Sequence, residues 1–226
     1  MKKIIIAAGL SCAALVAVPA SAGTLYASDF ASGDSGFSGG NNVASQGYAG
    51  LGFGSNVYRA TTVPAADASV SVTTAAVSGA TLELSLAIID SWDGVGGACC
   101  GPDAFTVKMD GATLFATVFD NYDNFGANTD AGLATLSYGT NLGFSGFNDA
   151  AYTLSLNLGD LSAGTHTFDF IASGPGWQGG DDESFAVGNV VLAGTPTSAV
   201  PEPSNVALML SAMLGLALAA RRRSRK

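Results

Sequence analysis

Short runs of alternating apolar and polar residues, separated by clusters of glycine, asparagine and aspartate, recur through the middle of this chain. In the run TLELSLAIID, for example, Leu82, Leu84 and Leu86 fall on one face of an extended segment. Alternation with a period of two is typical of a strand with one buried face, and no long helical period appears between residues 23 and 193. The pattern therefore predicts an all-β fold for this part of the chain.

The run DAFTVKMDGATLFATVFD has the pattern of a hairpin whose two-residue turn is Asp110-Gly111. A hairpin centred on that turn pairs its two halves residue by residue, which decides which side chains share a face. The expected core-facing set is Phe105, Val107 and Met109 on the first strand and Ala116, Leu114 and Ala112 on the second. This register places Phe115 and Phe119 on the outward face.

Strands of this length and spacing, about nine in all, are typical of a two-sheet antiparallel β-sandwich, and the predicted arrangement is jelly-roll-like. A β-helix is the alternative all-β architecture, but the sequence has no fixed short repeat to support it. The predicted domain covers residues 23–193. The segment 194–204, rich in proline, serine and threonine, is predicted to be a linker.

The N-terminus has the three parts of a secretory signal peptide. Lys2 and Lys3 come first, an apolar run follows over residues 4–18, and Ala20-Ser21-Ala22 supplies small residues at the expected cleavage site. The run is shorter than the roughly 20 residues of a membrane-spanning helix. We therefore predict a signal peptide over 1–22 and a mature chain that starts at Gly23.

The C-terminus carries an uncharged apolar run over residues 206–220, followed by an arginine-rich end. As a helix this run is about 23 Å long, which makes it a marginal span for a hydrocarbon core of about 30 Å. The basic residues after it hold the chain end on the cytoplasmic side. The sequence thus predicts a single hydrophobic transmembrane helix with its basic tail over 205–226.

The order of features at this end resembles the PEP-CTERM sorting signal of Gram-negative bacteria. Pro201-Glu202-Pro203 precedes the short apolar helix, and the arginine-rich tail closes the chain. The resemblance implies that a membrane enzyme of the exosortase type recognises Pro201, Glu202 and Pro203 and cleaves near them. It also implies a transient tether to the inner membrane, followed by transfer to the cell surface or the extracellular matrix.

The central domain is similar to bacterial exported jelly-roll domains of the kind found in carbohydrate-binding modules and MAM-type adhesion domains. The similar stretches are SDFASG, DSWDG followed by GPDAFTVKMDG, LSAGTHTFDF and DESFAVGNVVL. The last stretch has Val187-Gly188-Asn189 where that pattern places an acidic residue at position 188. The resemblance therefore implies a fold and an exported location, without an activity.

The predicted mature domain is strongly acidic. Between residues 23 and 200 only Arg59 and Lys108 are basic, against seventeen Asp and Glu, which gives a formal charge of −15. Such a surface repels phosphate backbones, so nucleic acid is excluded as a partner. It attracts cations instead, although a high charge is also a common solubility feature of secreted proteins.

Two acidic clusters are candidates for a calcium site. The loop DSWDGVGGACCGPDAF holds Asp90, Asp93 and Asp103, and a second cluster joins Asp29 to Asp182, Glu183 and Asn189 if the first and last strands are neighbours. Calcium prefers several oxygen ligands of this type. Neither cluster has the spacing of an EF-hand, nor does the acidic set of Asp120, Asp123 and Asp130. The alternative is that these carboxylates form turns and are solvated.

Cys99 and Cys100 are adjacent and would remain in the exported chain, in an oxidising compartment. A vicinal disulfide is predicted, although adjacent Cα atoms at about 3.8 Å are closer than the usual spacing of about 4.4–6.8 Å. Free thiols and an intermolecular bond are the alternatives.

Trp92 and Trp177 lie among glycines and are candidates for a glycan-stacking surface, assisted by Phe115 and Phe119 on the outward face of the hairpin. The alternative is that each indole closes one end of the sandwich, with its ring buried and its N–H hydrogen-bonded.

Catalysis has little support in the sequence. The single histidine, His166, shares a strand face with apolar residues and is expected at the edge of the core, and no G-x-S-x-G motif is present. The predicted function is an exported, noncatalytic surface or extracellular-matrix protein that binds extracellular polysaccharide or mediates adhesion. The alternative is a secreted polysaccharide hydrolase, which requires a cleft with two facing carboxylates.

Overall fold

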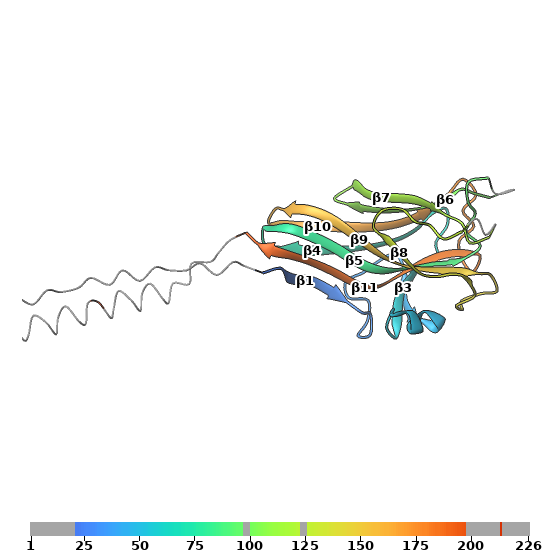
Figure 1. The fold of residues 1–226 in the computed structure, drawn as a ribbon, viewed down its shortest axis with the longest axis horizontal. Coiled ribbons are helices and arrows are strands. Elements are labelled where there is room, and N and C mark those ends of the chain that lie inside the picture. The colour runs from blue at the N-terminus through green and yellow to red at the C-terminus, as the bar shows by residue number, and fades with distance from the viewer. Residues whose placement is uncertain (1–20, 97–99, 123–125, 198–212, 214–226) are drawn as a thin grey trace, which may run out of the picture.

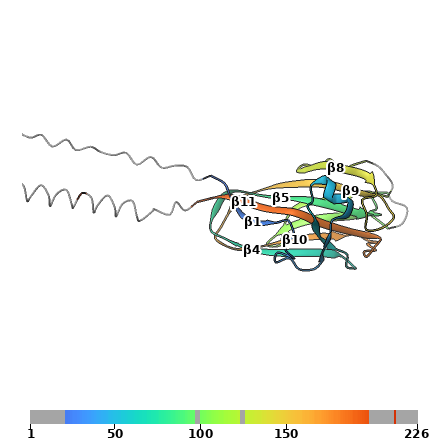
Figure 2. The same ribbon diagram turned by 90° about the horizontal axis from the view of Figure 1, so that it is seen from below.

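The computed structural model describes residues 21–96, 100–122, 126–197 and 213, and all structural statements concern these residues. They form eleven strands and one short 3-10 helix, arranged as two antiparallel sheets packed face to face (Figure 1). Figure 2 shows the two layers from a second direction, with β4 and β10 on one side and β8 and β9 on the other. The prediction of an all-β, two-sheet antiparallel sandwich is confirmed.

The larger sheet has seven strands, six of which follow one another in hydrogen-bonded order. These are β2 (Asn41–Ala44), β3 (Asn56–Ala60), β11 (Glu183–Pro196), β5 (Val77–Asp90), β9 (Asp149–Leu161) and β8 (Leu133–Thr140). The seventh, β1 (Gly23–Ser28), pairs with the later part of β11, while β3 pairs with its beginning. The smaller sheet has the order β4 (Ala66–Thr74), β10 (Gly164–Ser173), β6 (Asp103–Met109) and β7 (Ala112–Phe119).

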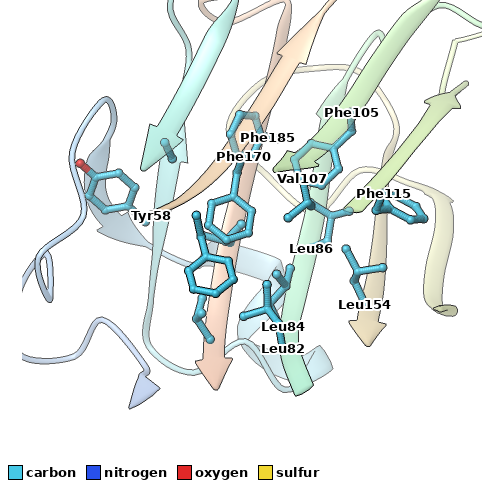
Figure 3. Packing of buried hydrophobic residues seen from close by; sticks show 14 of the residues in the cluster. Tyr58, Leu82, Leu84, Leu86, Phe105, Val107, Phe115, Leu154, Phe170 and Phe185 are labelled. Carbon is cyan, nitrogen blue, oxygen red and sulfur yellow. The ribbon is translucent and has the colours of Figure 1, made fainter. Parts of the chain in front are cut away.

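The main core lies between the two sheets and follows the predicted alternation. Leu82, Leu84 and Leu86 of β5 face Phe105 and Val107 of β6 and their neighbours, and all are buried (Figure 3). Each such side chain gains about 1.5–3 kcal/mol when it leaves water. This burial holds the two sheets together, and the hydrogen bonds between neighbouring strands fix the register within each sheet.

The hairpin of β6 and β7 has the predicted turn but a different register. Asp110 and Gly111 both adopt positive φ, at 51° and 82°, as a two-residue hairpin turn requires. A bulge at Leu114 then moves Val107 opposite Phe115 instead of Leu114. One extra residue reverses the facing of every later side chain. Phe115 and Phe119 are therefore buried in the core and Ala116 is exposed, which corrects the predicted core-facing set.

A second, smaller core covers part of the outer face of the larger sheet. The 3-10 helix η1 (Gln46–Leu51), between β2 and β3, brings Tyr48 and Phe53 onto Ala87, Ile89 and other small residues of the sheet. The end of β5 is consequently buried on both faces, and its uninterrupted apolar run LAII matches that environment.

Both ends of the described domain lie at one end of the sandwich, which we call the exit end. Gly23 of β1 is paired with Gly194 of β11, and the two strand ends lie side by side in Figure 1. Strand β11 continues to Pro196, so the domain extends past the predicted boundary at residue 193. Among the described residues, no helix has the length and apolar character needed to cross a membrane. The predicted signal peptide and sorting segment lie outside the described residues, except for Met213 and the last residues of 1–22.

Candidate metal centre

Three buried carboxyl groups meet at the end of the sandwich opposite the exit end, which we call the triad end. Asp93 lies in the loop after β5, Asp103 is the first residue of β6, and Glu183 is the first residue of β11. Each contributes a carboxylate oxygen, and these oxygens lie within 4.8 Å of one another. Asp103 and Glu183 are fully buried, and Asp93 is 6% exposed.

Backbone hydrogen bonds fix the three side chains. The amide of Asp93 donates to Asp103 Oδ2 at 2.7 Å, and the amide of Asp103 donates back to the Asp93 carbonyl at 2.9 Å. The amide of Gln178 donates to Glu183 Oε2 at 2.7 Å. The other carboxylate oxygens, Asp103 Oδ1 and Glu183 Oε1, are buried and have no hydrogen-bond donor while both groups are ionised. A proton on one of the two acids allows a side-chain hydrogen bond between Asp103 and Glu183. Buried polar atoms are rarely left in this state, so these two oxygens indicate a missing proton or cation.

Glycines allow the loops to close around the triad. A Cβ atom on Gly174 would lie 2.4 Å from Asp103 Oδ1, and one on Gly101 would lie 2.6 Å from the Asp93 carbonyl oxygen. Any larger residue at either position would push the loop away from the carboxylates. Gly101 and Gly174 therefore allow this close packing.

Burial changes the acidity of the triad. It raises the pKa of Asp103 to about 6, with the nearby Asp93 carboxylate adding to the effect. Burial, together with the charges of Asp103, Asp182 and Asp93, also raises the pKa of Glu183 to about 8. Removing carboxylates from water and placing them together disfavours the charged forms. At neutral pH and without a cation, Glu183 therefore holds a proton.

Among the described residues, neither basic side chain of the domain forms an ion pair with Asp103 or Glu183. Arg59 donates to Ser184 Oγ at 2.9 Å and to the Gly180 carbonyl at 3.1 Å, and it lies 3.8 Å from an Asp181 oxygen. Lys108 is about 16 Å along β6 from Asp103. The charge of the triad is thus left for an ion or protons to neutralise.

The donor set fits a hard divalent cation. Calcium is bound by six to eight oxygens from carboxylates, carbonyls and water, at flexible geometry. Three carboxylates, two of them with an unpartnered oxygen, supply such ligands in a water-poor site. Histidine and thiol ligands, which zinc prefers, do not occur in this group of described residues.

Asp90 does not join the triad, although it was predicted with Asp93 and Asp103. It has a φ of 69°, which breaks the strand alternation, and its Oδ1 accepts a hydrogen bond from Ser145 Oγ at 2.5 Å. Its amide donates to Asp149 Oδ1 at 2.9 Å. Burial raises the pKa of Asp90 to about 6. Asp90 and Asp149 thus hold the loop between β8 and β9, and sequence reasoning missed Asp149 because it sits in an ordinary strand start.

The second predicted cluster is divided between distant places. Asp29 and Asn189 line one surface hollow of about 470 Å³. Asn189 lies about 20 Å along β11 from Glu183, too far for a shared ion. Asp182 Oδ1 instead accepts a hydrogen bond from Ser91 Oγ at 2.6 Å. Of this cluster, only Glu183 reaches the triad, which corrects the prediction.

The third acidic set, Asp120, Asp123 and Asp130, does not form a metal-binding group among the described residues. Asp130 accepts a hydrogen bond from the Thr117 hydroxyl, which holds the start of the loop before β8. Asp123 lies outside the described residues. Cys100 is disulfide-bonded, and Cys99 lies outside the described residues, so the vicinal pairing stays a prediction.

Trp92 and Trp177 are buried, so the predicted glycan-stacking surface is wrong. Their rings contact each other edge to face, with centroids 5.1 Å apart, and Trp92 also packs on Phe119. Trp92 Nε1 donates to the Ser184 carbonyl and Trp177 Nε1 to the Thr62 carbonyl, both at 2.9 Å. The indoles close the triad end of the core, as the alternative interpretation expected.

His166 lies at the edge of the core, as predicted. It is nearly buried, and its Nδ1 is 2.7 Å from Asp110 Oδ2 while its Nε2 is 3.0 Å from the Ser162 carbonyl. The hydrogen bond to Asp110 raises the pKa of His166, and the same bond lowers the pKa of Asp110. The pair belongs to the β6–β7 turn and lies far from the triad.

No protein-family model matches this chain, and no curated protein matches it.

Proposed function

We propose that the protein is an exported, noncatalytic β-sandwich of the cell surface or extracellular matrix, whose triad end is held together by a calcium ion. The observation that carries this proposal is the buried group of Asp93, Asp103 and Glu183 with its two unpartnered oxygens. A cation there neutralises the carboxylates and ties three segments together, namely the loop after β5 and the starts of β6 and β11.

The placement of the triad supports a display function. Strand β11 begins at Glu183 and ends at Pro196, and its 14 residues span about 43 Å. The chain therefore leaves the domain at one end, while the triad and its loops lie at the other. A domain tethered through its C-terminus presents the triad end to its surroundings.

Export and tethering belong to the same proposal. Pro201, Glu202 and Pro203 would be recognised by an exosortase-type processing enzyme after a transient tether to the inner membrane, and the released domain would meet extracellular polysaccharide. The proposal includes a jelly-roll-like order of strand connections, because the sequence resembles exported domains that have this fold.

Two features favour a binding domain over a polysaccharide hydrolase. The triad is closed to a substrate, because none of its three residues is more than 6% exposed. Three surface hollows have one acidic side chain each among their lining residues, namely Glu83, Asp29 and Asp181, and the first two hollows adjoin at Asn189 and Val191. A hydrolase of the usual kind needs two carboxylates that face each other across an accessible bond.

The test is a melting experiment on the full-length exported protein, purified in mild detergent. Millimolar CaCl₂ should raise the melting temperature by several degrees more than NaCl of equal ionic strength, because an ion that binds only the folded state stabilises it. Asp103→Asn and Glu183→Gln should each remove the difference. Glu83→Gln changes an exposed acid outside the triad and should keep it. Equal melting curves in calcium and matched sodium chloride would overturn the proposal.

A further inference from the structure

Two exposed aromatic rings touch each other on the surface. Tyr122 is 56% exposed and Phe147 is 43% exposed, and their centroids lie 6.3 Å apart with planes inclined by 59°. Most other aromatic side chains of the domain are buried, including both tryptophans. Two large exposed rings in contact form an apolar patch that water solvates poorly, and such patches commonly mark a binding surface.

The backbones of Tyr122 and Phe147 are anchored on the segment that leads into the triad. The amide of Tyr122 donates to the Trp92 carbonyl at 3.2 Å, and the amide of Asn121 donates to the same oxygen at 2.9 Å. The backbone of Phe147 hydrogen-bonds the Asp90 carboxylate. Asp90 and Trp92 lie directly before Asp93, so two separate loops are held by one short stretch at the triad end.

The chemistry around the rings narrows the class of ligand. The loop that carries Phe147, NLGFSGFN over residues 141–148, has no charged side chain of its own. Its Asn141 amide is used within the loop, where it donates to the Ser145 carbonyl and accepts from the Gly143 amide. The domain as a whole is acidic, which disfavours anionic polymers and nucleic acid. A protein partner of ordinary size would need about 800 Å² on this side, far more than two rings provide. A ring-sized, uncharged ligand with an apolar face and hydroxyl groups fits best.

We propose that Tyr122 and Phe147 form a stacking surface for the sugar rings of a neutral polysaccharide. Sugar rings place their C–H groups on aromatic faces, which is the contact that two exposed rings can offer. Because the planes of the two aromatic rings are inclined to each other, they suit a polysaccharide whose successive sugar rings are rotated relative to one another. This inference rests on the proposed function, because it names the ligand class of the displayed triad end.

The triad and the stacking surface are coupled through the backbone. A cation at Asp93 fixes the loop that begins at Asp90, and that loop supplies the carbonyl and carboxylate that hold both rings. Calcium therefore strengthens polysaccharide binding without touching the sugar.

The experiment is affinity electrophoresis of the full-length protein through gels that contain dextran, galactomannan, arabinoxylan or soluble β-glucan, with anionic alginate as comparator. At least one neutral polymer should retard the native protein. Tyr122→Ala and Phe147→Ala should each weaken that retardation about tenfold in apparent Kd, whereas Tyr122→Phe, which keeps the ring, should bind like the native protein. Leu136→Ala is a matched control, because Leu136 is an exposed apolar residue of β8 outside this pair.

The inference is overturned if no neutral polymer retards the protein, if only alginate does, or if the ring variants bind as well as Leu136→Ala. Chelation with EGTA should weaken the binding of the native protein. Failure of the sugar assay with a normal calcium effect on melting removes this inference alone, whereas loss of the calcium effect removes the proposed function. The melting temperature of each variant in calcium should match that of the native protein, so that reduced binding is separated from misfolding.

Discussion

At the exit end of the sandwich, His166 has a partner on each ring nitrogen, whereas at the triad end Asp103 and Glu183 each keep a buried oxygen without one. The polar atoms of the His166 ring are therefore satisfied within the protein chain. The triad has three buried carboxylates, and Asp103 and Glu183 each have one buried oxygen without a hydrogen-bond partner, so the stability of this group depends on what the solution supplies. The proposal therefore predicts that the triad responds to cations and that the His166–Asp110 pair does not.

The largest expected effect comes from opening the triad end. Trp92→Ala should lower the free energy of unfolding by about 3–5 kcal/mol, because it leaves a cavity between Trp177 and Phe119 and frees the Ser184 carbonyl. Urea denaturation followed by circular dichroism measures the loss. A loss below 1 kcal/mol would show that Trp92 does not close this end.

A second prediction concerns pH and distinguishes the two ends. Glu183 and Asp103 have folded-state pKa values of about 8 and about 6, above the ordinary values for these acids. An acid with a raised folded pKa stabilises the fold below its unfolded pKa and loses that contribution as the pH rises through the folded value. In EGTA, the melting temperature should therefore fall by several degrees between pH 5 and pH 8.

Calcium should remove most of this fall, since a bound cation favours the charged carboxylates. Glu183→Gln should flatten the profile in EGTA, because it removes the group with the higher pKa. The same pH dependence with and without calcium would place its origin outside the triad.

A smaller effect is expected at the exit end. The raised pKa of His166 means that the protonated ring stabilises the fold at low pH, and that this contribution is lost as the pH rises from below about 6.5 through the folded value. His166→Asn should reduce stability at pH 5.5 by about 1 kcal/mol or less, because the Asp110 side chain is 46% exposed to solvent. The loss, measured by urea denaturation, should be equal in calcium and in EGTA; a calcium-dependent loss would contradict the separation of the two ends.

The strand pattern could be predicted from the sequence because alternation depends on local residue order. Local residue order was enough to predict the buried leucines of β5, the Asp110-Gly111 turn and the position of His166 at the edge of the core. The bulge at Leu114 was not, since a single extra residue leaves the composition of the run unchanged while it reverses Phe115 and Ala116. The covering of β5 by η1 was also missed, because a contact between Tyr48 and Ile89 depends on how the chain returns across the sheet.

The acidic residues of the candidate site were recognised individually but grouped wrongly. Asp93 and Asp103 are close in the sequence, whereas Glu183 joins them only because β11 lies beside β5 in the larger sheet. Asp90 was excluded by its own backbone conformation, a positive φ that no neighbouring residue indicates. The exposed pair of Tyr122 and Phe147 arises from two loops that meet only in the folded domain, so sequence order gave no signal for it.

The central claim is that the triad binds one calcium ion, and equilibrium dialysis of the full-length protein against calcium at pH 7.5 tests it most directly. We predict one high-affinity calcium ion per chain for the native protein and for Glu83→Gln, and the loss of that ion in Asp103→Asn and in Glu183→Gln. Native protein that takes up no calcium, or triad variants that still take up one ion per chain with the same affinity, would contradict the account.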